Sequence, residues 1–574
     1  MTTRPASLAF SLAPVLLLQT GAQAPAPEMA VRLVPAAPDG KGHIPYVDVS
    51  IAVEGEKASA GEAVFALPVV ANTLVTSAND LTDLRFSDAA GALAVMSRDE
   101  VQDGSNTLRR WIAGRAVSGA IRVEYRVPIH ADAPPLALPQ YEMRTEGGTF
   151  AAASNAFLLV PVDHVARRVH VSWDFSRYDS GSATHGVGAS SIGASSIGMG
   201  DAWSHEALAP ERLGSIYVMG GHPGSFGPAS DGFFGVWQGK PAFDMAPTMR
   251  WAGDLHRFYG RFFGYTPPSF GVFGRTNTKN PGSGIGLVDS FAFTFNQTST
   301  PADLRSLLAH EMLHSWVNSL DGSMDVADGL DRSWFGEGLA VYYQRALPYR
   351  AGMISTKDFL ADLNETVARY YTNAKIATPN AEIPDGFWRD TRIRVLPYDR
   401  GSLYFAVVDA QIRAASKGKR SLDDIVRAML AARRAGKPMN EALYRSLLKG
   451  DLGQKGVAGL DAMLAGGVQL PPSDAFGPQF RRIQVPLRRF DLGFDPASLI
   501  GRPRIVQGLI AGSEAQKAGL RDGDEIVNTF PQDKLQGDQT AWLTLDVRRD
   551  GQTFSLRYQP RGETVMAYQW VAAR

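Results

Sequence analysis

The sequence contains no cysteine. This absence excludes disulfide bonds, thiolate metal ligands and acylation of a cysteine at a processed N-terminus. Any transition-metal site must therefore be built from histidine and carboxylate groups. The absence does not identify a compartment, because both oxidising and reducing locations tolerate a cysteine-free chain.

An excess of either charge is also missing, since Lys and Arg together number 58 and Asp and Glu also number 58. The sequence therefore predicts neither nucleic acid nor an anionic membrane as a partner. Beyond the N-terminal segment, no run of about 18 apolar residues predicts a membrane-spanning helix. At 574 residues the chain is too long for a single core, and we expect several domains.

The N-terminal segment has the pattern of a secretory signal. Arg4 supplies a positive charge, residues 8–18 are apolar, and small residues follow. We place the signal at residues 1–22, because cleavage after Ala24 would put a proline next to the cut. The apolar run is too short to persist as a membrane anchor. We expect a bacterial periplasmic or secreted protein with no membrane span after signal removal.

The strongest chemical signal is the sequence HEMLH at residues 310–314. On a helix, His310 and His314 lie on one face and can bind the same metal ion. Glu311 projects from the same helix and can reach the attacking water without binding the metal. The helix is predicted independently, because Thr300 has the character of an N-cap and is followed by a first-turn proline and an acid. The pattern predicts a hydrolytic centre with one Zn²⁺ per chain.

The third metal ligand has to be a carboxylate or an upstream histidine, because His314 is the last histidine of the chain. Glu337 precedes an apolar, helix-compatible run at residues 338–343. This context is expected of a ligand on a second buried helix. A helix-start acid stabilised by the helix dipole is the alternative interpretation of Glu337. We predict that His310, His314 and Glu337 hold the ion.

Three motifs together resemble the glycyl aminopeptidase family of gluzincin zinc metallopeptidases, whose members often carry a PDZ domain. They are H-E-x-x-H, then W-x-x-E-G-x-x-x-Y-Y at residues 334–343, and Y-x-(K/R)-G at residues 398–401. The similarity spans residues 242–470. It implies a thermolysin-like, mostly helical catalytic domain that hydrolyses peptides.

The resemblance also implies roles for individual residues. Tyr398 would donate a hydrogen bond to the oxyanion, although a packed core tyrosine is the alternative. Glu311 would be the general base. Relatives have a glutamate before the zinc helix that helps to hold a substrate's free amino group, and here that position is Val288. Asp289 could replace it, or amine recognition could be lost.

The segment at residues 286–295, just upstream of the zinc helix, alternates apolar residues. This pattern predicts either an edge strand that pairs with an extended peptide or an ordinary sheet strand. Gly286 and Asp289 are the expected substrate contacts.

The whole chain is predicted to be a multidomain α+β protein. Alternating runs separated by turns predict an antiparallel β domain at residues 28–225. Helical patterns follow from residue 242, with one helix expected at 247–263. Residues 478–574 resemble a PDZ domain, in which the loop at residues 492–494 would present backbone N–H groups to a peptide's C-terminus. The alternative is that this module packs against the catalytic domain and captures nothing.

Two classes of function remain open. The leading hypothesis is a secreted or periplasmic zinc metallopeptidase, favoured as an aminopeptidase and with an endopeptidase as the alternative. The second is a PDZ-bearing peptide-binding adaptor with a vestigial peptidase domain. The intact Glu311 argues against the adaptor, because a protein that only binds peptides has no need of a general base.

Overall fold

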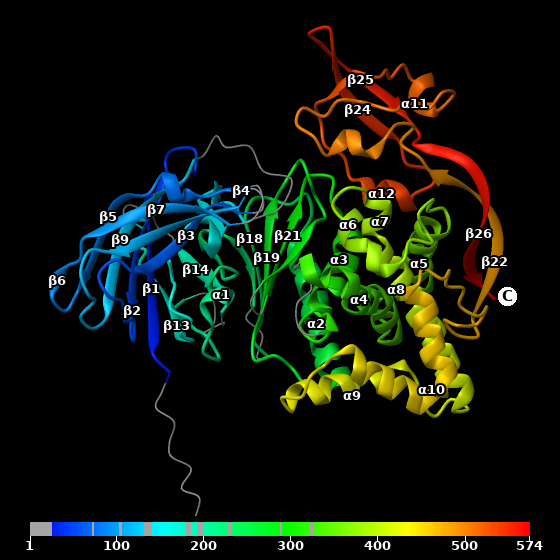
Figure 1. Ribbon diagram of the computed structural model, residues 1–574, viewed down its shortest axis with the longest axis horizontal. Helices are drawn as coiled ribbons and strands as arrows, with labels where there is room; N and C mark the ends of the chain where they lie inside the picture. The colour runs from blue at the N-terminus through cyan, green and yellow to red at the C-terminus, as the bar shows by residue number, and fades with distance from the viewer. Residues whose placement is uncertain are drawn as a thin grey trace, which may run out of the picture.

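The computed structural model describes residues 26–573, apart from 72–73, 103–105, 131–140, 180–184, 193–199, 228–230, 288–289 and 321–326. Asp289 and the expected signal at residues 1–22 lie outside the described residues. Figure 1 shows a β domain, a mostly helical body that contains a sheet, and a small C-terminal domain above it. The predicted multidomain α+β architecture is confirmed. None of the described helices has the length and apolar character needed to cross a membrane.

The N-terminal domain contains three sheets. The first has the order β15-β13-β1-β2-β9-β5-β6, with bounds Ala202–Trp203, Arg168–Trp173, Glu28–Pro35, Tyr46–Val53, Ile121–Pro128, Thr82–Asp88 and Gly91–Ala92. The second has the order β12-β3-β8-β7, with β4 on β3; the bounds are Val160–Pro161, Ala63–Ala71, Thr107–Ala113, Val95–Val101 and Leu74–Val75. The third has the order β10-β11-β16-β14, with bounds Arg144–Glu146, Thr149–Ala153, Tyr217–Gly221 and Val187–Ser190. The short helix α1 spans Pro210–Leu213.

The first two sheets pack face to face, as the alternation of the sequence predicts. Every second residue of β2 is buried, and Val49 shares one core with Phe65 and Trp111 of the second sheet. The predicted antiparallel β domain is confirmed, with one exception: β1 pairs with β13 in parallel. Parallel neighbours need a long connection, and here the chain forms other strands between β1 and β13. Antiparallel neighbours can be joined by a tight hairpin.

The helical body begins with a five-stranded sheet in the order β17-β18-β19-β21-β20. Its strands span Gly224–Phe226, Phe233–Trp237, Phe270–Thr276, Ser290–Phe295 and Gly284–Leu287. The sheet therefore starts upstream of residue 242, because β18 pairs in parallel with β19. Only β20 lies at the edge next to the predicted zinc helix, while β21 lies inside the sheet between β19 and β20. The predicted edge strand at residues 286–295 is thus two strands, of which the first is the edge.

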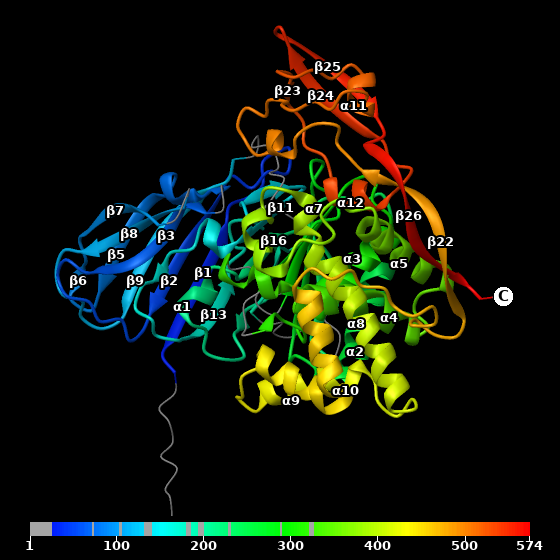
Figure 2. The same ribbon diagram turned by 45° about the vertical axis from the view of Figure 1, so that its right-hand side comes forward.

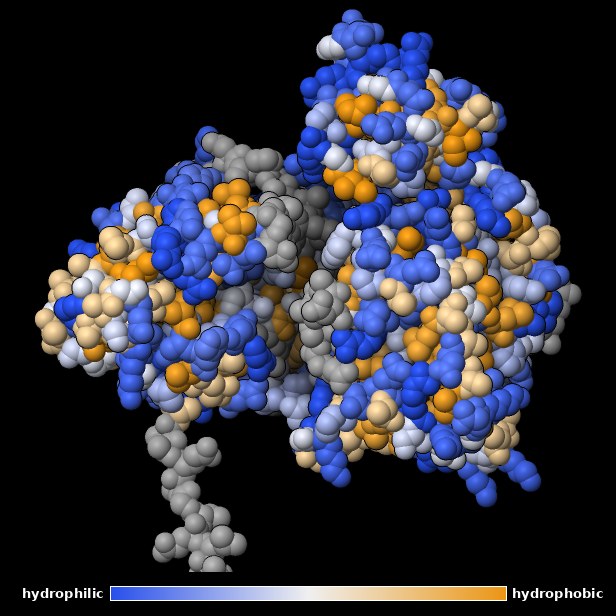
Figure 3. All heavy atoms as spheres, in the orientation of Figure 1, coloured by the Kyte–Doolittle hydropathy of each residue, from blue (hydrophilic) through white to orange (hydrophobic). Residues whose placement is uncertain are grey.

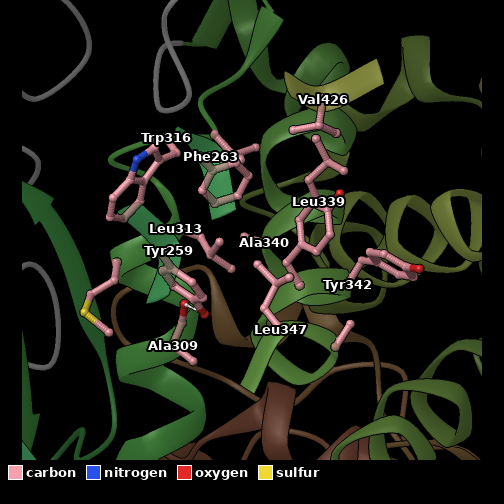
Figure 4. Close-up of a cluster of buried hydrophobic side chains, with 14 of the residues drawn as sticks. Tyr259, Phe263, Ala309, Leu313, Trp316, Leu339, Ala340, Tyr342, Leu347 and Val426 are labelled. Atoms are coloured by element: carbon pink, nitrogen blue, oxygen red, sulfur yellow. Dashed lines mark hydrogen bonds between the residues drawn. The ribbon is translucent and has the colours of Figure 1, made fainter. Parts of the chain in front are cut away.

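The helices cover this sheet and form the main core. They are α2 Met245–Phe263, α3 Pro301–Leu313, α4 Ser333–Arg350, α5 Thr356–Tyr371, α6 Ile383–Gly386, α7 Thr391–Arg394, α8 Leu396–Ala415, α9 Leu422–Arg434 and α10 Glu441–Leu464. Figure 4 shows side chains of α2, α3 and α4 converging, and the Tyr259 hydroxyl donates to the carbonyl of Ala309 at 3.1 Å. The helix predicted at residues 247–263 is confirmed. Helix α3 is thus enclosed by apolar neighbours, which fixes the position of its polar face.

The C-terminal domain joins the body through a two-stranded ribbon of β22 (Phe480–Phe490) and β26 (Arg561–Ala572). Both views show this ribbon along α5 (Figure 2). The remaining elements are a sheet of β23 Glu525–Ile526, β24 Leu543–Arg549 and β25 Gln552–Tyr558, with helices α11 Glu514–Lys517 and α12 Gln532–Gly537.

The ribbon docks with both apolar and polar contacts. Trp570 and Phe480 share a core with Phe359 of α5. The Asn364 amide donates to the Trp570 carbonyl and accepts from the Trp570 N–H, each at 2.9 Å. The module therefore packs against the catalytic domain. Its PDZ-like identity stays a prediction, and Pro496–Leu499, directly after the loop at 492–494, form a 3₁₀ turn.

Candidate metal centre

Two buried helices carry the three predicted metal ligands. Helix α3 begins at a capping box, in which Thr300 and Asp303 satisfy each other's backbone N–H groups. His310 lies in its last turn and His314 is its C-cap, still with helical dihedral angles. Glu337 lies in the second turn of α4 and is 7% exposed. The helix predicted for the HEMLH sequence is confirmed in its start and its buried face.

The three side chains converge on one point. Nε2 of His310 lies 3.1 Å from Oε2 of Glu337, and Nε2 of His314 lies 3.6 Å from the same oxygen. The two Nε2 atoms are 3.3 Å apart. Each residue thus offers one donor atom, and all three lie within 4.8 Å of one another. Two imidazoles and one carboxylate are a donor set that suits Zn²⁺.

The outer nitrogen of each imidazole is held by a neighbour, which orients the inner nitrogen. Nδ1 of His314 donates to the Val317 carbonyl at 3.1 Å. Nδ1 of His310 lies 2.9 Å from Oε1 of Gln344, whose amide nitrogen donates to Asp362 Oδ2 at 2.8 Å and to the Ser306 hydroxyl at 3.0 Å. Since Gln344 uses its nitrogen in this way, its oxygen accepts from His310. Both Nε2 atoms are therefore free to bind a metal.

The electrostatics of the cluster favour a cation between the ligands. Burial disfavours the charged form of His314, but the hydrogen bond and charge of Glu337 outweigh it and raise the pKa of His314 to about 9. Burial would raise the pKa of Glu337, but the hydrogen bonds from His310 and His314 hold that pKa well below its usual range. The carboxylate is thus ionised, and a divalent ion can take the place of the imidazole proton.

Tyr398, in the first turn of α8, stands beside the metal ligands. Its hydroxyl donates to Oε1 of Glu337 at 3.1 Å, and its ring stacks at 6.2 Å from that of His310. Two glycines bring α8 this close to α4. A Cβ on Gly401 would lie 2.5 Å from the Trp334 carbonyl oxygen, and a Cβ on Gly338 would lie 2.7 Å from the Gly401 Cα. The glycines of the second and third motifs thus permit a backbone-to-backbone crossing.

Glu311 faces the edge strand β20. A Cβ on Gly284 would lie 2.7 Å from Oε1 of Glu311, so glycine leaves the space that this carboxylate uses. Gly286, farther along the strand, is exposed and has open space in front of it. The predicted base and the predicted substrate contact Gly286 therefore lie on the same edge. The other predicted contact, Asp289, falls outside the described residues.

Sequence reasoning missed the residues that orient His310. Gln344 lies two helical turns after Glu337 and so on the same face of α4, a spacing that could have indicated a shared site. The sequence contains no such signal for Asp362 and Ser306. They lie on α5 and α3, so their contact with Gln344 depends on how the helices pack. Gly284 was missed as well, since nothing in the sequence places it against Glu311.

The comparisons with known proteins agree with this geometry. Residues 303–382 match the family model of the M61 glycyl aminopeptidases. The match covers all three predicted metal ligands and Glu311, and it ends before Tyr398. The resemblance to this family is confirmed for this part of the chain. The predicted enzyme class, an aminopeptidase-like zinc metallopeptidase, and the predicted metal, zinc, are confirmed with it. No curated protein matches the chain.

A solved structure shares the fold over most of the chain. An aminopeptidase N family protein from Idiomarina loihiensis is 15% identical with a TM-score of 0.65, and the match covers 95% of this chain and 98% of that one. A mutant M1 zinc metallopeptidase from Deinococcus radiodurans, bound to a Tyr-Ser-Ala substrate, is 16% identical with a TM-score of 0.45, covering 78% of this chain and 95% of that one. At this identity, the first likeness is evidence for the fold alone.

Proposed function

We propose that this protein is a zinc aminopeptidase in which His310, His314 and Glu337 hold the metal. The observation that supports the proposal is the convergence of these three donor atoms next to Glu311 and a free strand edge. The chain offers a metal site, a base and a surface for an extended peptide within one small volume. Metal-assisted hydrolysis of a peptide bond uses each of these parts.

A zinc ion held by these residues would polarise the scissile carbonyl and acidify the attacking water. Glu311 takes the proton from this water and passes it to the leaving amine. Tyr398 donates its hydroxyl hydrogen bond to the developing oxyanion, for which it has to turn away from Glu337. The edge of β20 orients the substrate through main-chain hydrogen bonds near Gly286, and Asp289 or a neighbouring group receives the free amine.

A peptide library with free or acetylated N-termini tests this proposal. Zinc-loaded protein should release N-terminal residues from the free peptides, a chelator should stop the reaction, and added zinc should restore it. Product masses identify the cut positions. Internal cuts in acetylated peptides would instead establish an endopeptidase. The absence of any cut, with peptide binding unchanged in Glu311→Gln, would favour the adaptor.

We also propose that the protein is exported to the periplasm or secreted. The support is the signal pattern at residues 1–22 together with a chain that requires no reduced thiols. Expression in a bacterial host followed by fractionation and N-terminal mass analysis tests it. A mature chain that starts near Gln23 in the periplasm or medium is expected, and an unprocessed cytoplasmic chain would contradict the proposal.

A further inference from the structure

A cavity of about 800 Å³ lies between the catalytic domain and the C-terminal domain. This volume is within the range of small-ligand sites, about 300–1,000 Å³. Its walls come from the first half of α3, the loop at residues 279–283, helix α5 and the C-terminal-domain segment at residues 529–534, which ends in the first turn of α12. Hydrophilic residues line much of the surface where the two domains join (Figure 3).

The cavity lies next to residues that contact the metal centre. Gln344 lines it and also holds His310 through Nδ1. Ser283 lines it and directly precedes Gly284, which lies against Glu311. Leu307, one turn before Glu311 on α3, is a further wall residue. A substrate whose scissile bond lies at Glu311 therefore has this space directly beside it.

The direction of β20 assigns the cavity to one side of the scissile bond. The strand runs from Gly284 to Leu287, and the cavity lies beyond its Gly284 end. A peptide that pairs with it in antiparallel register has its N-terminus near Leu287 and its C-terminus toward Gly284. The residues after the scissile bond, which leave with the new amine, then enter the cavity.

The lining has cations that are not paired with carboxylates. Three arginines of the lining form ion pairs: Arg345 with Asp362, Arg369 with Asp399, and Arg394 with Asp533. Among the described residues, none of the ion pairs within 4.0 Å involves the other cations of the lining, Lys279, Arg305, Arg504 and Lys534.

The buried parts of two of these arginines also lack an acceptor. Within the part of the chain that the structure describes, Nε of Arg305 and Nε of Arg504 are buried without a hydrogen-bond acceptor. Burial and the neighbouring Arg502 lower the pKa of Arg504, as expected of a cation without a counter-charge. Arg504 is anchored by one bond, from Nη1 to the Asn528 carbonyl at 3.0 Å. A guanidinium held in this way favours a carboxylate.

The lining contains five acidic side chains against seven basic ones, so basic side chains are in excess. Asp303 and Asp358 cap helices, and Asp362 and Asp533 are paired as described. Glu365 is left, and burial raises the pKa of its carboxyl, against the charges of Arg369 and Lys534. The cavity therefore offers positive charge to a ligand.

We propose that this cavity is the subsite for the leaving half of the substrate, and that it selects short peptides by binding their C-terminal carboxylate at Arg504 with help from Arg305. This inference rests on the proposed peptidase function. The C-terminal domain then forms one wall of the substrate site, in addition to any role as a PDZ-like module. Long or C-terminally blocked chains fit this wall poorly.

Two series of short peptides that differ only in a C-terminal carboxylate or amide test the proposal on the full-length, zinc-loaded protein. We expect wild type to have a kcat/KM about 10-fold higher for the acids, as for a charge-assisted hydrogen bond. Arg504→Gln should bring the acid-to-amide ratio toward unity, and Arg504→Lys should retain part of it. Arg502→Gln, an exposed arginine of the same loop, is the matched control and should keep the wild-type ratio.

A wild-type ratio near unity, or a wild-type ratio retained by Arg504→Gln, would overturn the proposal. Thermal unfolding shows whether the variants are equally folded. If the protein cuts neither series, the proposed function fails, and calorimetric binding of the same peptides to Glu311→Gln decides the subsite. The proposed subsite is supported if Glu311→Gln binds the acids more tightly than the amides and the double variant with Arg504→Gln loses this preference. Equal binding of acids and amides refutes the subsite.

Discussion

At the metal centre, Glu337 meets a histidine only 27 residues away in the chain, whereas the C-terminal domain meets the catalytic domain through pairs such as Asn364 and Trp570, 206 residues apart. The first region uses two helices that are close in the sequence, and helical periodicity places His310 and His314 on one face of α3. The second depends on a ribbon that returns from the end of the chain to α5. No local pattern encodes that contact.

The difference teaches which changes should stay local. An apolar shell around α3 holds the metal ligands in place. Replacing a polar side chain of the metal centre should therefore change the chemistry and leave the fold intact. A few large side chains hold the C-terminal domain against the catalytic domain. Removing one of them should separate the two domains and leave the metal in place. Gln344 and the cavity lie between the two regions and connect them.

Glu311→Gln should produce the largest effect on the catalytic side of this comparison. Removing a general base costs about 10²–10⁴-fold in rate, while the unfolding temperature and zinc content should not change. Steady-state kinetics and metal analysis measure both. Glu124→Gln, which changes an exposed side chain on β9 of the β domain, is the control. Activity close to wild type in Glu311→Gln would eliminate the proposed base.

Trp570→Ala should break the docking of the C-terminal domain. Trp570 is fully buried, and its ring N–H donates to the Ser473 carbonyl at 3.0 Å. Loss of a buried tryptophan costs about 3–5 kcal/mol, and limited proteolysis should then cut near residues 471–479. Zinc content should persist. The control Trp542→Ala removes a side chain that is 52% exposed and should change stability by less than about 0.5 kcal/mol. Loss of zinc together with docking would show that the two regions are not separable.

Gly401→Ala tests the crossing that sets Tyr398 against Glu337. The added methyl would meet the Trp334 carbonyl at 2.5 Å, so α4 and α8 have to separate, at about 1–3 kcal/mol. We expect lower stability and slower hydrolysis in the same variant. Gly450→Ala, in helix α10 with open space around it, should instead stabilise by about 0.5–1 kcal/mol. Equal behaviour of the two variants would contradict the close crossing.

Gln344→Ala should give the smallest effect, because it leaves all three metal ligands in place. Removing a group that orients a metal-bound histidine weakens metal affinity about 10–100-fold. Competition with a chelator of known affinity measures this change. Gln297→Ala, which removes an exposed side chain bonded to the Lys240 carbonyl, is the control. Unchanged zinc affinity in Gln344→Ala would remove the proposed link between the cavity wall and the metal.

Much of the helical body could be predicted because its signals are short-range. The N-cap Thr300, the apolar face of α3 and the spacing of its histidines all act within a few turns. The strands of the β domain were predicted by alternation, but the parallel pair of β1 and β13 was not, since alternation does not specify a partner. The segment at 286–295 was predicted as one strand, whereas the structure divides it between β20 and β21, because nothing in its apolar alternation marks where the first strand ends.

The sequence by itself determined which side chains are available for metal binding and catalysis, because helix periodicity and the lack of cysteine leave few alternatives. Tertiary structure alone decided how they are oriented: Gln344 through Asp362 on another helix, Tyr398 through a glycine crossing, and Glu311 through a glycine on a separate strand. It also decided that the C-terminal domain closes a charged cavity beside the metal centre. These contacts join segments far apart in the chain, and their geometry depends on packing of the whole protein.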